Sequence, residues 1–243
     1  MLNQILLKKY IHEKTNDLII IRMFLAFGVS IFIAVPALFL KSHGFSDSYI
    51  GLIMGGVSLI SLIISITSTI ILEKINEYKI FLFSIFIPLA LLSTLVFYPS
   101  IYIFILFLIV SAIFRTLRQN SFSIIFKDTA KNETYTQKQG LAYSLTNIGW
   151  FVGPFIGGLV LDNFGFVETF GLSAIFFFIA LTISLMTSIR LKNKSRKTID
   201  SNIIKNIKFY FKQKELIYSY FLAFSSSIWY VLIFTFMPLF LIG

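Results

Sequence analysis

Four polar side chains stand close together in an apolar stretch at residues 100–123: Arg115, Arg118, Gln119 and Asn120. Arg115 and Arg118 are three residues apart and would share one face of a helix. Arg115 lies roughly 15 residues into the stretch, past the middle of a membrane core about 30 Å thick. A charge there is costly unless it faces a cavity or the interior of a helix bundle. We therefore interpret the four residues as part of a solute pathway, in which Arg115 would suit an anion.

The polar residues allow two other interpretations. Both arginines could instead extend to lipid phosphates at the membrane surface, which suits Arg118 better than Arg115. Enzymatic chemistry is not indicated, because the sequence contains no H-E-x-x-H, no G-x-S-x-G and no carboxylate pair within an apolar segment. With no cysteine and two distant histidines, His12 and His43, we expect no metal site, no cofactor and no catalytic residue.

Long apolar segments must position these residues. Of the 243 residues, 57% are hydrophobic and 29 are phenylalanine, which exceeds the usual apolar share of a soluble domain. Seven segments are long enough to cross a bilayer as helices. They are residues 18–40, 48–72, 79–98, 100–123, 140–161, 168–189 and 216–242. The predicted fold is an all-α integral membrane protein with seven transmembrane helices.

Positive charge is confined to one side of these segments. Every Lys and Arg except Lys41 falls in a flank, a loop or the end of a segment on the side of the N-terminus. By the positive-inside rule that side is cytoplasmic, so we expect a multi-pass protein of the cytoplasmic membrane. This distribution also explains the net charge of +10 without a nucleic-acid partner. The expected partners are the lipid bilayer and a small-molecule substrate.

A glycine-rich stretch lies in the fifth segment. Gly149, Gly153 and Gly157 are spaced by four residues and would share one helix face, against which a second helix can pack almost backbone to backbone. Pro154 removes one backbone donor and would bend the helix. Together with Gly158, these residues read G-x-x-x-G-P-x-x-G-G, which resembles the signature of exporters in the major facilitator superfamily.

This resemblance implies a transporter of two six-helix halves that works by alternating access, with the substrate site between the halves. It divides the chain into a cytoplasmic segment (1–17), a six-helix half (18–189), a basic cytoplasmic linker (190–215) and the first helix of a second half (216–243). The implied function is secondary transport of a small molecule across the cytoplasmic membrane, and the glycine signature favours efflux.

Two further stretches resemble motifs of the same family less closely. Glu73, Lys74 and Lys79 occupy acidic and basic positions of the general motif G-x-x-x-D-R-x-G-R-R/K, where Thr69 replaces the first glycine. The resemblance implies a cytoplasmic gate held by charge pairing. The alternative is a solvated charged turn, which would contribute little stability. In the fourth segment, Arg115 matches the first position of R-x-x-Q-G, and the rest fits only with a shift of one residue.

The sequence is also compatible with other functions. The chain could be a non-transporting membrane scaffold or receptor that kept the fold, or an inactive truncated fragment of a twelve-helix carrier. A second half, or a homodimer of this chain, would have to supply the other wall of the pathway. No Asp or Glu lies deep in a segment, so a proton-coupled carrier would need its titrating carboxylate elsewhere.

Overall fold

The computed structural model describes residues 14–33 and 35–187, together with residues 213, 217, 218, 221, 222 and 225. Its main helices are α2 (Lys14–Phe32), α3 (Val35–Ser42), α4 (Asp47–Lys74), α5 (Glu77–Phe97), α6 (Ile101–Thr129), α7 (Tyr135–Phe164) and α8 (Phe166–Met186), with a short 3-10 helix at Asn132–Thr134 before α7. Six spans, of which α2 and α3 form the first, are long and apolar enough to cross a membrane. The prediction of an all-α integral membrane protein is confirmed. The predicted seventh helix and the linker 190–215 lie outside the described ranges, apart from the few single residues named above.

Helix boundaries differ from the predicted segments in three places. The fourth and fifth spans extend well past the apolar stretches, to Thr129 and back to Tyr135. The apolar stretch measures only the thickness of the hydrocarbon core, so it does not mark where the helix ends. The first span is interrupted between Phe32 and Val35. Pro36, which follows, has no N–H to donate to the carbonyl of Phe32. By contrast, α7 continues through Pro154 without an interruption.

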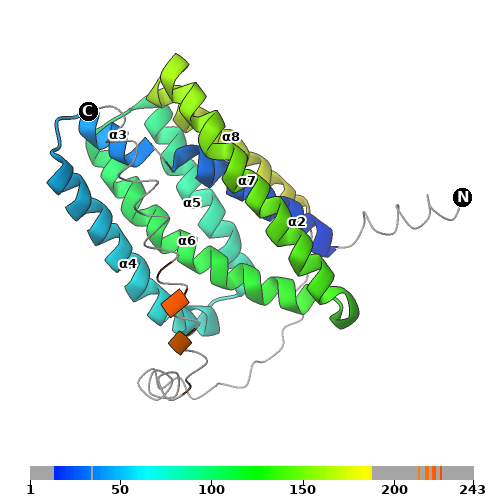
Figure 1. Cartoon of the computed structure of the whole chain (residues 1–243). Coiled ribbons are helices and arrows are strands. Elements are labelled where there is room, and N and C mark those ends of the chain that lie inside the picture. Colours follow the sequence, from blue (N-terminus) through cyan, green and yellow to red (C-terminus); the bar gives the residue numbers. More distant parts are fainter. Residues whose placement is uncertain are drawn as a thin grey trace, which may run out of the picture.

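The helices form a curved row in the order α4, α6, α5, α8, α2 and α7, in which each helix packs on the next. In Figure 1, α4 lies at one edge of the bundle and α7 and α8 lie at the other. The two ends of the row, α4 and α7, face each other across a cavity instead of packing together. We call the end of the bundle at which α2 begins and α6 and α8 end the basic end.

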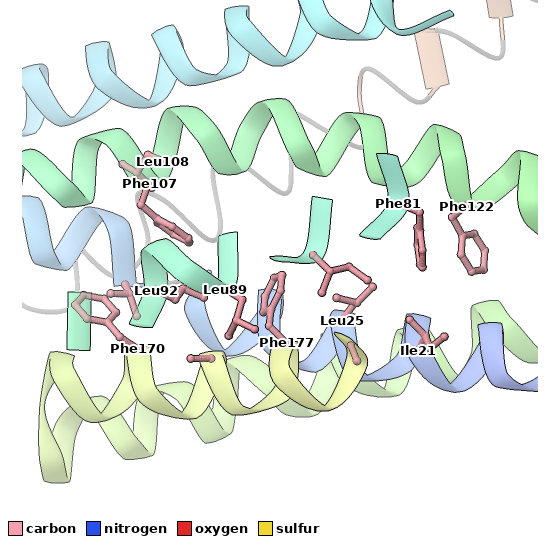
Figure 2. Close-up of a cluster of buried hydrophobic side chains, with 14 of the residues drawn as sticks. Ile21, Leu25, Phe81, Leu89, Leu92, Phe107, Leu108, Phe122, Phe170 and Phe177 are labelled. Atoms are coloured by element: carbon pink, nitrogen blue, oxygen red, sulfur yellow. The ribbon is translucent and has the colours of Figure 1, made fainter. Parts of the chain in front are cut away.

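A core of leucine, isoleucine and phenylalanine side chains holds the row together. Figure 2 shows side chains of α2, α5, α6 and α8 meeting between the helices, among them Ile21, Leu89, Phe122 and Phe177. Away from the basic end, phenylalanine rings pack closely in tilted arrangements, with the ring centroids of Phe39 and Phe104 4.3 Å apart. This aromatic packing holds α3 against α6 and α8 at the end opposite the basic one.

The glycines of the fifth span lie against the first span. A Cβ atom at Gly149 would stand 3.1 Å from the backbone nitrogen of Phe27, and one at Gly153 would stand 2.7 Å from the Cβ of Ser30. A Cβ at Gly157 would collide with the carbonyl of Ile31. The hydroxyl of Ser30 donates a 2.8 Å hydrogen bond to the carbonyl oxygen of Gly149. We call this contact of α2 with α7 the glycine seam. Gly158 lies outside it, with no described atom beyond its own stretch of helix within 4 Å of a Cβ there.

Candidate functional site

A cavity of about 580 Å³ lies on the concave side of the helix row. Its volume falls within the range of small-molecule sites, about 300–1,000 Å³. Helices α2, α4, α6 and α7 form its walls, and α5 and α8 contribute at its floor. Its polar and amphipathic lining residues are Arg22, Ser58, Ser61, Ser111, Arg115, Arg118, Tyr143, Thr146, Asn147, Trp150 and Ser173. No Asp, Glu or His is among the described residues that line it.

Three arginines reach this cavity from two helices. At 1.5 Å per residue, Arg22, Arg118 and Arg115 lie about 6, 8 and 12 Å inside the ends of the apolar stretches at residues 18 and 123. All three therefore stand within the apolar part of the bundle, where charges are rare and usually face a cavity or one another. The three guanidinium groups lie at successive depths between the basic end and the middle of the protein.

Arg22, which is half-buried, and Arg115, which is exposed on the cavity side, each lie beside aromatic rings. The Cζ of Arg22 lies 4.9 Å from the ring centroid of Phe122 and 4.7 Å from that of Tyr143. The Cζ of Arg115 lies 5.9 Å from the ring of Trp150. Such cation–π contacts stabilise a guanidinium group but leave its N–H donors free. Within the described residues neither arginine forms a hydrogen bond or an ion pair, so these donors are available to a solute.

Arg118 is held differently. Its side chain is only 8% exposed, its Nη1 donates a 3.1 Å hydrogen bond to the carbonyl of Ser84, and its Cζ lies 5.4 Å from the ring of Phe177. In a regular helix the carbonyl of residue 84 accepts from the N–H of residue 88. Residue 88 is Pro88, which has no N–H, so this carbonyl is free for Arg118. The alternative in which Arg118 extends to lipid phosphates is therefore wrong.

The remaining residues of the predicted pathway lie outside the cavity. Asn120 donates a 2.8 Å hydrogen bond through Nδ2 to Oγ of Ser68, which ties α6 to α4. The side chain of Gln119 is exposed and is not among the lining residues. The four neighbours in sequence therefore separate into two cavity residues and two that face elsewhere.

The predicted gate residues lie at the basic end. Glu73 and Lys74 stand in the last turn of α4, Lys79 in the first turn of α5, and all three side chains are exposed. None of them forms an ion pair with another described residue. The side chain of Asn76 caps α5 by accepting from the backbone N–H groups of Tyr78 and Lys79. A gating role for the charged residues stays a prediction.

Sequence reasoning missed several cavity residues. Arg22 was counted only among the flanking charges, although it stands four residues inside the predicted span 18–40. On α7, Tyr143, Asn147 and Trp150 recur at helical spacing on the face that lines the cavity. That periodic stripe of amphipathic side chains was the available signal.

Comparison with known proteins fits this architecture. The six apolar spans define a multi-pass membrane protein. Residues 18–243 match the family model described as Major Facilitator Superfamily, and the chain belongs to that family. Among solved structures it is similar to the POT family transporter PepTSo, determined from crystals grown in meso, with a TM-score of 0.60 and 16% sequence identity. The match covers 77% of this chain and 39% of the PepTSo chain, so this chain spans less than half of that transporter, and the likeness shows the fold alone. No curated protein matches significantly in sequence.

Proposed function

We propose that the chain is a secondary transporter that moves a small molecule across the cytoplasmic membrane by alternating access, in the direction of efflux. The observation that carries the proposal is a ligand-sized cavity within the membrane-spanning bundle, lined by three charged residues. Placing a charge at this depth in the membrane costs free energy. A solute pathway explains why the charges are there, whereas lipid contact or simple packing does not.

The efflux direction rests on the resemblance of the glycine seam to the exporter signature. Gly149, Gly153 and Gly157 bring α7 and α2 into backbone contact. Such a contact lets two helices move as one body while the opposite end of the row, α4, changes its distance from them. The cytoplasmic membrane follows from the bias of Lys and Arg towards one side of the spans.

A transporter of this kind needs a second wall for its cavity. Large apolar side chains of α4 and α7 stand exposed, for example Leu59 at 62% and Phe155 at 69%. In our proposal these helices contact lipid on one side, and a second six-helix half or a second copy of the chain closes the cavity on the other. The match covers 39% of the PepTSo chain, so a transporter of that length can contain a second half.

Alternating access can be tested by labelling because the sequence has no cysteine. Single cysteines would be placed at the cavity positions Ser61 and Thr146, and at Phe83, which is 55% exposed on α5 and does not line the cavity. Membrane-impermeant maleimide would then be applied to sealed vesicles of each orientation. We expect Ser61→Cys and Thr146→Cys to react from both sides and Phe83→Cys from neither. Reaction of the cavity positions from one side only would support a non-transporting scaffold instead.

Direction needs a separate measurement. Vesicles of the two orientations would be incubated with fluorescent solutes and compared with vesicles from cells that lack the protein. Efflux predicts uptake into inside-out vesicles against a gradient and none into right-side-out vesicles. The reverse pattern would make the protein an importer.

A further inference from the structure

We infer that the solute of this cavity is an organic anion: a small molecule with a flat apolar body and a carboxylate, sulfonate or phosphate group that binds Arg22 and Arg115. The inference rests on the proposed function for the statement that this solute is transported. Its binding to the cavity is a separate claim and is tested separately below.

The first argument is the balance of charge. Three guanidinium groups line the cavity and no acidic side chain among the described residues does. Arg118 is buried, Arg22 is half-buried and Arg115 is exposed on the cavity side, and charges within a membrane-spanning bundle are most stable when they are paired. A bound anion would supply this pairing, whereas a neutral solute would leave the positive charge in place and a cation would add to it.

The second argument is the difference among the arginines. Arg118 is fixed by the carbonyl of Ser84 and is buried. Arg22 and Arg115 lie on aromatic rings and have no hydrogen-bonding partner among the described residues. Guanidinium groups present a planar fork of donors that suits carboxylate, sulfonate and phosphate oxygens. Arg22 and Arg115 therefore act as the anion-binding pair, and Arg118 contributes a fixed positive field.

The third argument is the apolar part of the lining. Phe32, Phe107, Trp150 and Phe177 line the same cavity as the arginines. Flat rings prefer to stack on aromatic side chains. A simple inorganic anion would leave these walls and most of the roughly 580 Å³ unused. The chemistry thus favours an amphipathic anion over chloride or inorganic phosphate.

A matched set of probes tests this inference: p-toluenesulfonate, the neutral p-toluenesulfonamide and the cationic benzyltrimethylammonium. Trp150 lines the cavity, and the second of the two tryptophans is Trp229. In the full chain carrying Trp229→Phe, in a maltoside detergent, the fluorescence of Trp150 reports binding, and thermal denaturation gives a second readout. We expect the sulfonate to quench the fluorescence and raise the melting temperature, and the other two probes to do neither.

Variants separate the cavity from general electrostatics. Arg115→Gln should weaken sulfonate binding at least about tenfold, as expected for loss of a charge-assisted hydrogen bond, and Arg115→Lys should restore part of the affinity. The matched control is Lys127→Gln, which removes one charge from an exposed position near the end of the same helix. It should change the affinity less than twofold.

Several outcomes would overturn the inference. Equal binding of the sulfonate and the sulfonamide would show that charge is not recognised. Tighter binding of the cationic probe would show that a carboxylate from another part of the carrier neutralises the arginines. Equal effects of Arg115→Gln and Lys127→Gln would show that the preference for the sulfonate reflects only the net charge of the protein. Sulfonate binding without two-sided labelling of Ser61→Cys would uphold the anion site and refute transport, and the opposite pair of results would uphold transport and refute the anion site.

Discussion

Arg118 of α6 donates a hydrogen bond to the carbonyl oxygen of Ser84 on α5, at 3.1 Å. This carbonyl is free because the residue one turn later, Pro88, lacks the N–H that would normally bind it. The proline therefore creates an acceptor in the interior of the bundle, and the arginine satisfies it. A buried charge and an interrupted helix bond thus stabilise each other across two helices.

Loss of Arg118 should cost stability in a way that depends on Pro88. Arg118→Met leaves the carbonyl of Ser84 without a donor, which should destabilise the fold by about 1–3 kcal/mol. In a Pro88→Ala background the restored N–H binds that carbonyl, so the cost of Arg118→Met should fall. Thermal denaturation of the four proteins of this double-mutant cycle measures the coupling. Strictly additive melting temperatures would contradict it.

The glycine seam predicts opposite results for two glycines of one motif. Gly153→Ala brings a methyl group within 2.7 Å of the Cβ of Ser30, so we expect a loss of about 1–3 kcal/mol from overpacking. Gly158→Ala meets no described atom within 4 Å and should be neutral or slightly stabilising. Melting temperatures in detergent give the comparison, and Ser30→Gly should partly rescue Gly153→Ala. Equal losses at the two glycines would argue against a close seam.

At the basic end, one tyrosine joins two helices. The hydroxyl of Tyr78 at the start of α5 donates to the carbonyls of Ser184 and Thr187 at the end of α8. Thr187 in turn donates to the carboxylate of Asp17 on α2, at 3.2 Å. Tyr78→Phe should therefore lower stability by about 1 kcal/mol and increase proteolysis at this end. Tyr102→Phe, at a side chain that is 82% exposed, is the control and should have no effect.

Binding of the sulfonate probe should be insensitive to pH. The charged lining residues are Arg22, Arg115 and Arg118, and no Asp, Glu or His is among the described residues of the lining. The affinity for p-toluenesulfonate, which stays ionised, should vary less than about twofold between pH 5.5 and 8, as fluorescence titration would show, since only a titrating partner would change it by the tenfold that 1.4 kcal/mol represents. A tenfold change would reveal a titrating group from another part of the carrier.

The transmembrane spans and the class of membrane protein could be predicted from the sequence, because the length and apolar composition of each segment alone indicate whether it can cross a bilayer. The spacing of Gly149, Gly153 and Gly157 likewise predicted a close helix contact, although the partner helix could not be known. The cavity could be predicted only in part. Arg115 was expected near a pathway, but the direction of Arg118 depends on a carbonyl freed by Pro88 on another helix, which no local pattern reveals.

Arg22 shows a second limit. Charge counting assigned it to a flank, because a residue near a span boundary looks the same whether it faces lipid headgroups or a cavity. Its position beside Phe122 and Tyr143 depends on how α2, α6 and α7 meet. Conversely, Gln119 and Asn120 looked equivalent to the arginines in sequence, yet the 100° turn per residue of a helix directs them away from the cavity.

The glycine seam also has a consequence for how the chain can diverge during evolution. Gly149, Gly153 and Gly157 lie on backbone or Cβ atoms of α2, so almost any replacement there would push two helices apart. Gly55 and Gly56 on α4, across the same cavity, have no described atom within 4 Å of a Cβ. Among related chains, glycine should therefore persist on α7 and drift freely on α4. The contact of α7 with α2 would then be held nearly constant during divergence, while α4 can change at positions that do not line the cavity.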